Sequence, residues 1–128
     1  MVVTTTKGIR VSVETEYQEE YSSPGQMHYV FTYKITIENL SEHTIQLLER
    51  HWDIVDLTFP GRAVDGEGVI GKQPILEPGQ MHQYISGCNL KSGLGNMSGF
   101  YTMERLVDGR RFTVKIPQFD MVVPFRLN

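Results

Sequence analysis

The fold of this chain is decided by the stretch Tyr29-Val30-Phe31-Thr32-Tyr33-Lys34-Ile35-Thr36-Ile37-Glu38. Apolar residues occupy its odd positions, and polar residues occupy most of its even positions. This period of two is typical of a β-strand with one face on a core and the other in water. Ile9, Val11 and Val13 repeat the pattern upstream. The sequence therefore predicts two half-buried strands that share a core.

The composition extends this interpretation to the whole chain. The sequence holds 12 valines, 9 isoleucines and 10 threonines, but Ala63 is its single alanine. Alanine is the strongest helix former, whereas β-branched side chains pack well on a pleated sheet. These proportions favour an all-β protein over a helical one.

Length, charge and cysteine content limit the class of protein. The 128 residues correspond to one domain, in which we expect residues 1–7 to be flexible. A formal net charge of -3 lacks the basic surplus of a nucleic-acid binder. No apolar run approaches the roughly 20 residues of a membrane helix, so we expect no membrane partner. The single cysteine and the absence of a visible secretory signal predict a cytoplasmic protein.

Five further strands are expected downstream. The apolar parity shifts within residues 44–57, which predicts a bulge or a break near Glu49-Arg50. Asp108-Gly109 predicts a two-residue hairpin turn, and Pro117 and Pro124 bracket a short edge strand. The other expected strands cover residues 81–85, 101–107 and 112–116. The sum is an antiparallel β-sandwich of about seven to eight strands, of immunoglobulin-like or fibronectin type III-like form.

The segment Gly66-Glu67-Gly68-Val69-Ile70-Gly71 matches the pattern G-x-G-x-x-G. In a dinucleotide site such glycines open a helix that faces a pyrophosphate. Lys72-Gln73-Pro74 prevents a helix here, so we expect a structural loop. The alternative is an anion nest, in which backbone N–H groups of Gly66, Gly68 and Gly71 hold a phosphate and Lys72 or Arg62 adds charge.

Residues able to bind metal or to catalyse are scattered. None of the four histidines is spaced as a metal-ligand pair, and Cys88 has no Cys-x-x-Cys partner. We therefore expect no metal, no cofactor and no catalytic residue. A metal site assembled in space from His51, Asp53 and His82 is the alternative. Cys88 is expected to be a small buried apolar residue.

Two segments are candidates for partner binding. Trp52, the only tryptophan, is expected in the core, but it shares strand parity with Arg50, which leaves a partner-facing pair as the alternative. Residues 90–100 predict a long Gly-rich loop. In it, Leu94 and Met97 either form a partner-binding surface or tuck into the end of the core.

Several short motifs follow one another in a fixed order. They are Tyr29-Val30-Phe31-Thr32-Tyr33-Lys34-Ile35-Thr36-Ile37-Glu38-Asn39, Gln46-Leu47-Leu48-x-Arg50-His51-Trp52, Gly66-x-Gly68-Val69-Ile70-Gly71-x-Gln73-Pro74-x-Leu76-x-Pro78-Gly79, Tyr84-x-Ser86-Gly87-Cys88 and Met97-x-Gly99-x-Tyr101-x-Met103. Together they closely resemble the ApaG family, from about residue 9 to residue 124. Residues 91–96 differ from the sequence that the family usually has before the methionine at position 97.

The resemblance implies a fibronectin type III-like sandwich in a bacterial cytoplasmic protein linked by name to cobalt and magnesium efflux or resistance, without an established catalytic activity. It also implies a pyrophosphate-binding role for Gly66, Gly68 and Gly71. We therefore expect a non-enzymatic binding module that acts through a protein partner or a small phosphorylated ligand and influences divalent-cation homeostasis indirectly. The alternative is a pyrophosphate or nucleotide-polyphosphate binder, with or without weak phosphohydrolase activity. A homodimer through an edge strand is allowed but not required.

Overall fold

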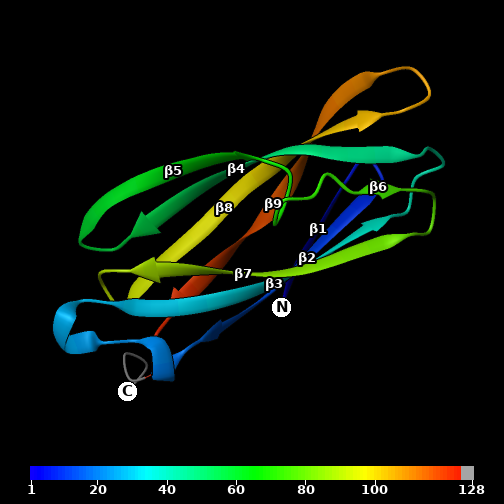
Figure 1. Ribbon diagram of the computed structural model, residues 1–128. Coiled ribbons are helices and arrows are strands. Elements are labelled where there is room, and N and C mark those ends of the chain that lie inside the picture. The colour runs from blue at the N-terminus through cyan, green and yellow to red at the C-terminus, as the bar shows by residue number, and fades with distance from the viewer. Residues whose placement is uncertain (125–128) are drawn as a thin grey trace.

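The computed structural model describes residues 1–124 and shows an antiparallel β-sandwich (Figure 1). One sheet has the strand order β1-β2-β3-β7, and the other has the order β5-β4-β8-β9 with β6 paired to β4. The strands are β1 (Val2–Thr6), β2 (Ile9–Tyr17), β3 (Tyr29–Asn39), β4 (Ile45–Asp56), β5 (Phe59–Glu67), β6 (Ile75–Leu76), β7 (Met81–Leu90), β8 (Leu94–Arg105) and β9 (Arg110–Val122). The all-β sandwich is confirmed, and its immunoglobulin-like or fibronectin-like form stays a prediction.

Two short 3₁₀ turns, η1 (Glu19–Tyr21) and η2 (Pro24–Gln26), connect β2 to β3. Within residues 1–124 no helix is long and apolar enough to cross a bilayer.

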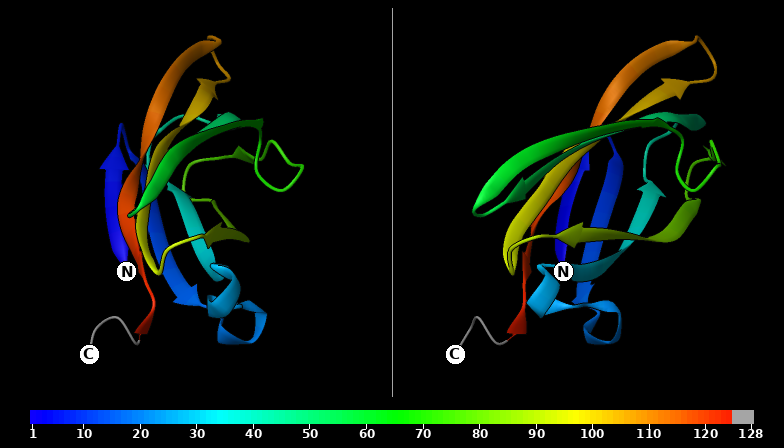
Figure 2. Two further views of the ribbon diagram at one scale, coloured as in Figure 1. Left: turned by 90° about the vertical axis from the view of Figure 1, so that its left-hand side faces the viewer. Right: turned by 60° about the vertical axis from the view of Figure 1, so that its left-hand side comes forward.

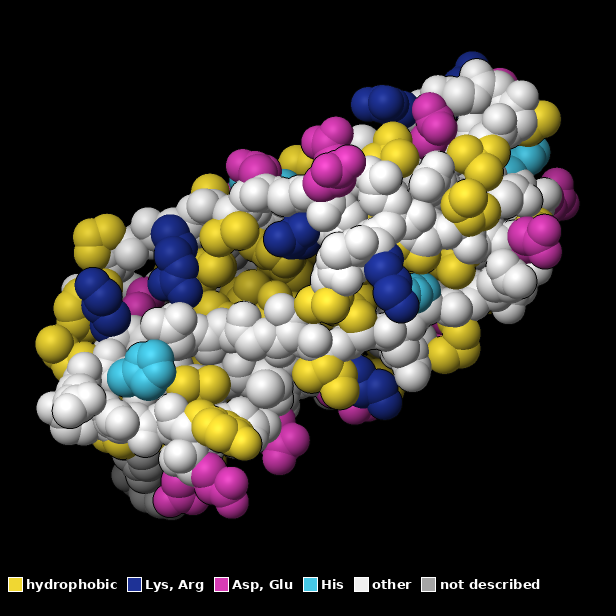
Figure 3. Space-filling view, in the orientation of Figure 1, with side chains coloured by type: hydrophobic (Ala, Val, Ile, Leu, Met, Phe, Trp, Pro, Cys, Tyr) yellow, Lys and Arg dark blue, Asp and Glu magenta, His cyan; other side chains and the backbone are white. Residues whose placement is uncertain are grey.

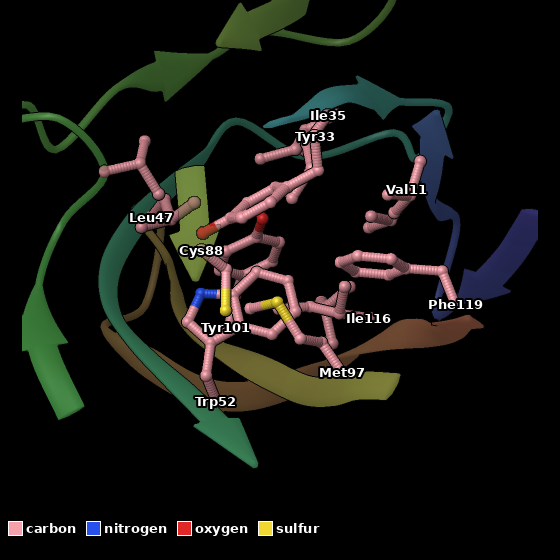
Figure 4. Close-up of a cluster of buried hydrophobic side chains, with 14 of the residues drawn as sticks. Val11, Tyr33, Ile35, Leu47, Trp52, Cys88, Met97, Tyr101, Ile116 and Phe119 are labelled. Atoms are coloured by element: carbon pink, nitrogen blue, oxygen red, sulfur yellow. The ribbon is translucent and has the colours of Figure 1, made fainter. Parts of the chain in front are cut away.

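The core lies between the two sheets, as the alternation of β3 predicted. Phe31, Tyr33, Ile35 and Ile37 are all buried. In the neighbouring strand, Val11 pairs with Ile37 and faces the same interior. Figure 4 shows the opposite wall of this core. Its buried side chains include Trp52, Met97, Tyr101, Ile116 and Phe119.

A β-bulge changes which residues of β4 face the core. The register between β4 and β8 shifts between Leu47 and Glu49, so that Leu48 is the extra residue. Ile45 and Leu47 are buried before the bulge, and Trp52 and Ile54 are buried after it. The predicted change of parity is confirmed just before the expected place, and β4 continues through it as one strand.

The predicted Gly-rich loop at residues 90–100 is wrong, because β8 already begins at Leu94. A Cβ on Gly99 would lie inside contact distance of the His51 carbonyl oxygen of β4, so this glycine permits close strand approach and does not form a loop. Met97 is 1% exposed and faces the core, which contradicts its place in a partner-binding surface. Leu94, half-buried at the start of β8, offers little surface without it.

The short connection between β7 and β8 is held by Asp56 at the end of β4. Its buried carboxylate accepts hydrogen bonds from the Lys91 N–H (2.7 Å), the Ser92 N–H (3.0 Å) and the Ser92 hydroxyl (2.5 Å). Burial alone would raise the pKa of Asp56, but these bonds outweigh it and lower the pKa. The carboxylate therefore stays charged and ties one sheet to the other.

The N-terminal segment and the last strand both differ from expectation. Val2–Thr6, expected to be flexible, form β1 and pair with β2, and the Lys115 N–H donates to Thr6 Oγ1 (3.2 Å). β9 is an edge strand, as predicted, but it runs through Pro117 without ending there. The register with β8 shifts beside this proline, and a bulge in an edge strand tolerates its missing N–H.

The hairpin predicted at Asp108-Gly109 is present with a longer loop. Arg105 pairs with Arg110, so residues 106–109 form the connection. Asp108 pairs with Arg105 and accepts a hydrogen bond from the Arg110 N–H, while Gly109 has a φ of +70°. These bonds stabilise the wider turn.

We expect Gly99→Ala to lower the free energy of unfolding by about 3 kcal/mol, as in other over-packed sites, because the new Cβ collides with a backbone carbonyl of the β4–β8 ladder. Gly25→Ala is the matched control, since nothing lies within 4 Å of its added Cβ. Urea unfolding measures both variants. Equal losses in the two, or no loss in Gly99→Ala, would contradict the close approach of β4 and β8.

Candidate functional site

The sandwich is closed along one side and open along the other. β1 and β2 lie against β9 on the closed side (Figure 2). On the open side the sheets end in the edge strands β5 and β7. Between these two strands Figure 3 shows an apolar hollow with basic side chains at its rim. This opening is where the molecule gives access to its interior.

The hollow contains a cavity of about 230 Å³, which we call the inter-sheet pocket. Strand register explains its composition. Tyr33 and Ser86 are partners across β3 and β7, and Arg50 and Gly66 are partners across β4 and β5. The lining residues are Tyr33, Arg50, Trp52, Glu67, Val69, Ile70, Gly71, Tyr84 and Ser86.

Arg50 supplies the positive charge of the inter-sheet pocket. Its Nη1 donates to the carbonyl oxygens of Gly68 (2.9 Å) and Glu67 (3.1 Å). Within residues 1–124 no carboxylate forms an ion pair with it. Its Nε and Nη2 have no protein acceptor there. Since no buried side-chain nitrogen or oxygen in that range lacks a partner, these two donor groups are accessible to solvent.

The G-x-G-x-x-G segment makes room for this arginine. A Cβ on Gly66 would lie 2.5 Å from the guanidinium carbon of Arg50, so only glycine leaves space for the group in this position. Gly68 has a φ of +64°, and a Cβ there would collide with the Lys72 carbonyl. The first two glycines of the motif thus serve close packing.

Three amides of this segment already have backbone acceptors. The Gly68 N–H donates to the Leu48 carbonyl (2.8 Å), the Val69 N–H to Lys72 (2.8 Å) and the Lys72 N–H to Val69 (3.0 Å). Ile70 and Gly71 both have positive φ and form the tip of this turn, as in a type I′ turn. The expected structural loop is present, and the three bonded amides are not free to hold a phosphate.

Lys72, the charge expected to assist a phosphate, lies away from Arg50. It lines a separate hollow with Met81 and His82. The structure therefore brings Gly66, Gly68 and Gly71 beside Arg50 but places Lys72 elsewhere.

Phenol groups form the wall opposite Arg50. The hydroxyl groups of Tyr84 in β7 and Tyr101 in β8 lie 2.5 Å apart and join the two sheets. Burial raises the pKa of Tyr84 and of Tyr101. Burial also raises the pKa of Tyr33, although a hydrogen bond with Ser86 opposes this. All three phenols are neutral at physiological pH and act as hydrogen-bond donors or acceptors.

Arg62 crosses the open side of the sandwich. From β5, its Nη2 donates to the carbonyl oxygen of Asn89 in β7 (2.8 Å) and lies 3.5 Å from Cys88 Sγ. Burial raises the pKa of the Cys88 thiol, although the positive charge of Arg62 opposes this. Cys88 is buried, as expected, and its neutral thiol lies in the core (Figure 4).

The proposed metal-binding trio is not assembled. His51 lies in β4, with Nδ1 2.5 Å from Asp65 and Nε2 3.1 Å from Asp53, and its ring stacks on Phe100. His82 lies in β7 of the other sheet. The set of His51, Asp53 and His82 is therefore wrong. Within residues 1–124 no group of three or more His, Cys, Asp or Glu is placed to hold a metal ion.

Part of the inter-sheet pocket was predicted from the sequence. Arg50 and Trp52 share a face, as their parity predicted, and that face lines the inter-sheet pocket. Tyr33 and Ser86 were missed as site residues. The inward parity of Tyr33 was visible in the sequence, but its register partner was not.

Comparison with known proteins identifies one family. The ApaG domain family matches residues 19–105. Protein ApaG of Brucella abortus is 45% identical over 119 residues, which cover 93% of this chain and 91% of that protein. Protein ApaG of Methylorubrum populi shows the same identity over the same length. The crystal structure of a Bordetella pertussis protein named ApaA has a TM-score of 0.87 at 40% identity and covers 91% of this chain and 94% of that one.

Glycine substitutions should distinguish Gly68, which packs against a backbone carbonyl, from Gly66, which packs against the flexible end of the Arg50 side chain. Gly68→Ala should destabilise the fold by about 2 kcal/mol or more, because both its φ and the Lys72 carbonyl oppose a side chain. Gly66→Ala should cost less than about 1 kcal/mol, because the flexible end of Arg50 can move aside. Thermal unfolding compares the variants. A loss in Gly66→Ala as large as in Gly68→Ala would show that Arg50 is held rigidly.

The two histidines in opposite environments should titrate on opposite sides of 6.5. The hydrogen bond with Asp65 raises the pKa of His51, whereas burial lowers the pKa of His82. A raised pKa in the folded state adds stability that is complete below pH 6.5 and is lost as the pH rises through the folded pKa. Asp65→Asn should therefore lower the His51 pKa, measured by NMR titration, and leave that of His82 unchanged. A His51 pKa at or below 6.5 in the unsubstituted protein would contradict the ion pair.

Proposed function

The chain belongs to the ApaG domain family, and from this premise we propose that it is a non-catalytic binding module whose ligand site is the inter-sheet pocket. One observation carries the proposal. Arg50 is partly buried beside the pocket, with two donor groups that have no acceptor within residues 1–124. An anionic ligand would give these two accessible donor groups charge-assisted hydrogen bonds and would balance the guanidinium charge.

Non-catalytic action is supported by the state of the reactive side chains. Burial raises the pKa of the Cys88 thiol, and a thiol is a far weaker nucleophile than a thiolate. The ring nitrogens of His51 are engaged by Asp53 and Asp65 on the outer face of the sheet. Neither group stands ready to transfer a proton to a ligand in the inter-sheet pocket.

The proposed link to cobalt and magnesium homeostasis is indirect. The module would influence these ions through the ligand or protein partner that it binds. His51 and its two carboxylates, which resemble a metal site in composition, satisfy one another without an ion. A cytoplasmic location belongs to the same proposal, since Cys88 has no second cysteine to pair with.

A pyrophosphate or nucleotide-polyphosphate ligand is the alternative. The observation in its favour is that Gly71 and Arg50 line the same pocket. Against it, Lys72 lies elsewhere, and the N–H groups of Gly68, Val69 and Lys72 already have acceptors. Arg50 is the one cationic side chain in the described lining of this pocket, and one guanidinium balances one negative charge. The geometry therefore favours a ligand with a single negative charge.

Calorimetric titration tests the proposed site. The probes are benzoate, phenylacetate, pyrophosphate, ATP and diadenosine tetraphosphate, the last three with and without magnesium or cobalt. At least one probe should give saturable heat, and Arg50→Gln should weaken its binding by about tenfold or more, because a charge-assisted hydrogen bond is lost. Each phosphorylated probe should be recovered unhydrolysed.

Arg10→Gln is the matched control, because it removes the same charge from the outer face of β2, where Arg10 pairs with Glu38. Its binding should equal that of the unsubstituted protein. If no probe gives heat that depends on Arg50, the inter-sheet pocket is not the ligand site.

A further inference from the structure

The inference below rests on the proposed function and names the ligand class of the same pocket. The size of the pocket is the first restriction on that ligand. Drug-sized ligands occupy pockets of about 300–1,000 Å³, and the inter-sheet pocket measures about 230 Å³. It accommodates one terminal group of a larger molecule rather than a whole nucleotide.

The charge and shape of Arg50 restrict that group further. With Nη1 bonded to the Glu67 and Gly68 carbonyls, the edge formed by Nε and Nη2 remains. This edge matches the two oxygens of one carboxylate. The neighbouring walls supply an indole ring from Trp52 and an apolar side chain from Ile70. A carboxylate attached to an apolar or aromatic group fits these features.

A free sheet edge runs directly past the pocket. The Val30 N–H donates to Ser22 Oγ, and the Val30 carbonyl oxygen accepts from the Gln18 N–H, so Val30 does not bond its β7 partner Asn89. In an antiparallel ladder every second residue then points its backbone groups away from the partner strand. Ile85 and Gly87 follow Asn89 in this alternation, and β7 has no strand on its second side within residues 1–124. Their N–H and C=O groups are available to an added strand.

A second positive charge lies along the same edge. Arg62 pairs with Ile54 and Gly66 pairs with Arg50, so the two arginines are separated by four positions along the strands, about 13 Å. Arg62 also has no carboxylate partner within residues 1–124, and it donates to the β7 carbonyl of Asn89. A strand lying on β7 with its last residue at Arg50 would bring the residue four positions before the last one to Arg62.

We propose that the inter-sheet pocket captures the C-terminal carboxylate of a partner protein. The last residues of that partner add a strand to the free edge of β7, beside Ile85 and Gly87. The carboxylate binds Arg50, the final apolar side chain lies against Trp52, and an acidic residue about four positions upstream binds Arg62. Main-chain pairing gives affinity in such complexes, and the pocket and the second charge give specificity.

The test compares two short peptides that end in phenylalanine and carry glutamate about four residues upstream. One has a free C-terminal carboxylate, and the other has a C-terminal amide. The acid should bind about tenfold or more tightly than the amide in calorimetry. NMR should show amide shifts at Ile85 and Gly87 on binding of the acid.

Variants of the two arginines separate their roles. Arg50→Gln, and Arg50→Lys with its charge retained but its planar fork lost, should each remove the preference for the acid. Arg62→Gln should weaken binding of the glutamate peptide by about threefold or more and leave binding of a matched glutamine peptide unchanged. Arg10→Gln, on the outer face, should alter neither.

Equal binding of the acid and the amide by the unsubstituted protein would overturn the inference, and this comparison does not depend on any variant folding. If pyrophosphate binds through Arg50 while the acid peptide does not bind, the inference fails and the proposed ligand site stands. If neither shows binding that depends on Arg50, both fail.

Discussion

The bulge at Leu48 is the feature on which the rest of the open side depends. By adding one residue to β4 it turns Arg50 and Trp52 toward the interior. The Leu48 carbonyl accepts hydrogen bonds from the Gly68 N–H (2.8 Å) and from Gln73 Nε2 (3.0 Å). The same irregularity therefore aims the arginine and anchors the loop that surrounds it. In a regular strand Arg50 would lie on the solvent face.

The two long sides of the sandwich differ in the kind of side chains that they contain. On the side where β9 meets β1 and β2, the inward-facing apolar residues, such as Val11 and Ile116, are fully buried. The side between β5 and β7 contains charges and hydroxyl groups, and Arg62 and the paired phenols of Tyr84 and Tyr101 bridge the sheets there. Polar groups in such a position hydrogen-bond across the opening, and those with unused donors can also hydrogen-bond a ligand.

Much of the fold could be predicted because its signals are local. Alternation located β3, and the shift of parity located the bulge in β4. Residues 90–100 could not be interpreted correctly, because a glycine needed for close strand approach looks the same in sequence as a glycine in a loop. Gly99 shows the difference only when His51 lies opposite it. Arg50 could be proposed for the site, whereas Tyr33 and Ser86 required the register between distant strands.

Trp52 is also an intrinsic fluorescence probe of the inter-sheet pocket. It is the single tryptophan of the chain, and its indole belongs to the wall of the inter-sheet pocket. Its ring meets Tyr33 and Phe119 edge-on in the core (Figure 4). Intrinsic fluorescence excited at the indole band therefore comes from this wall alone. Emission wavelength and quenching report on hydration there without an added dye, and the rest of the fold contributes no competing signal.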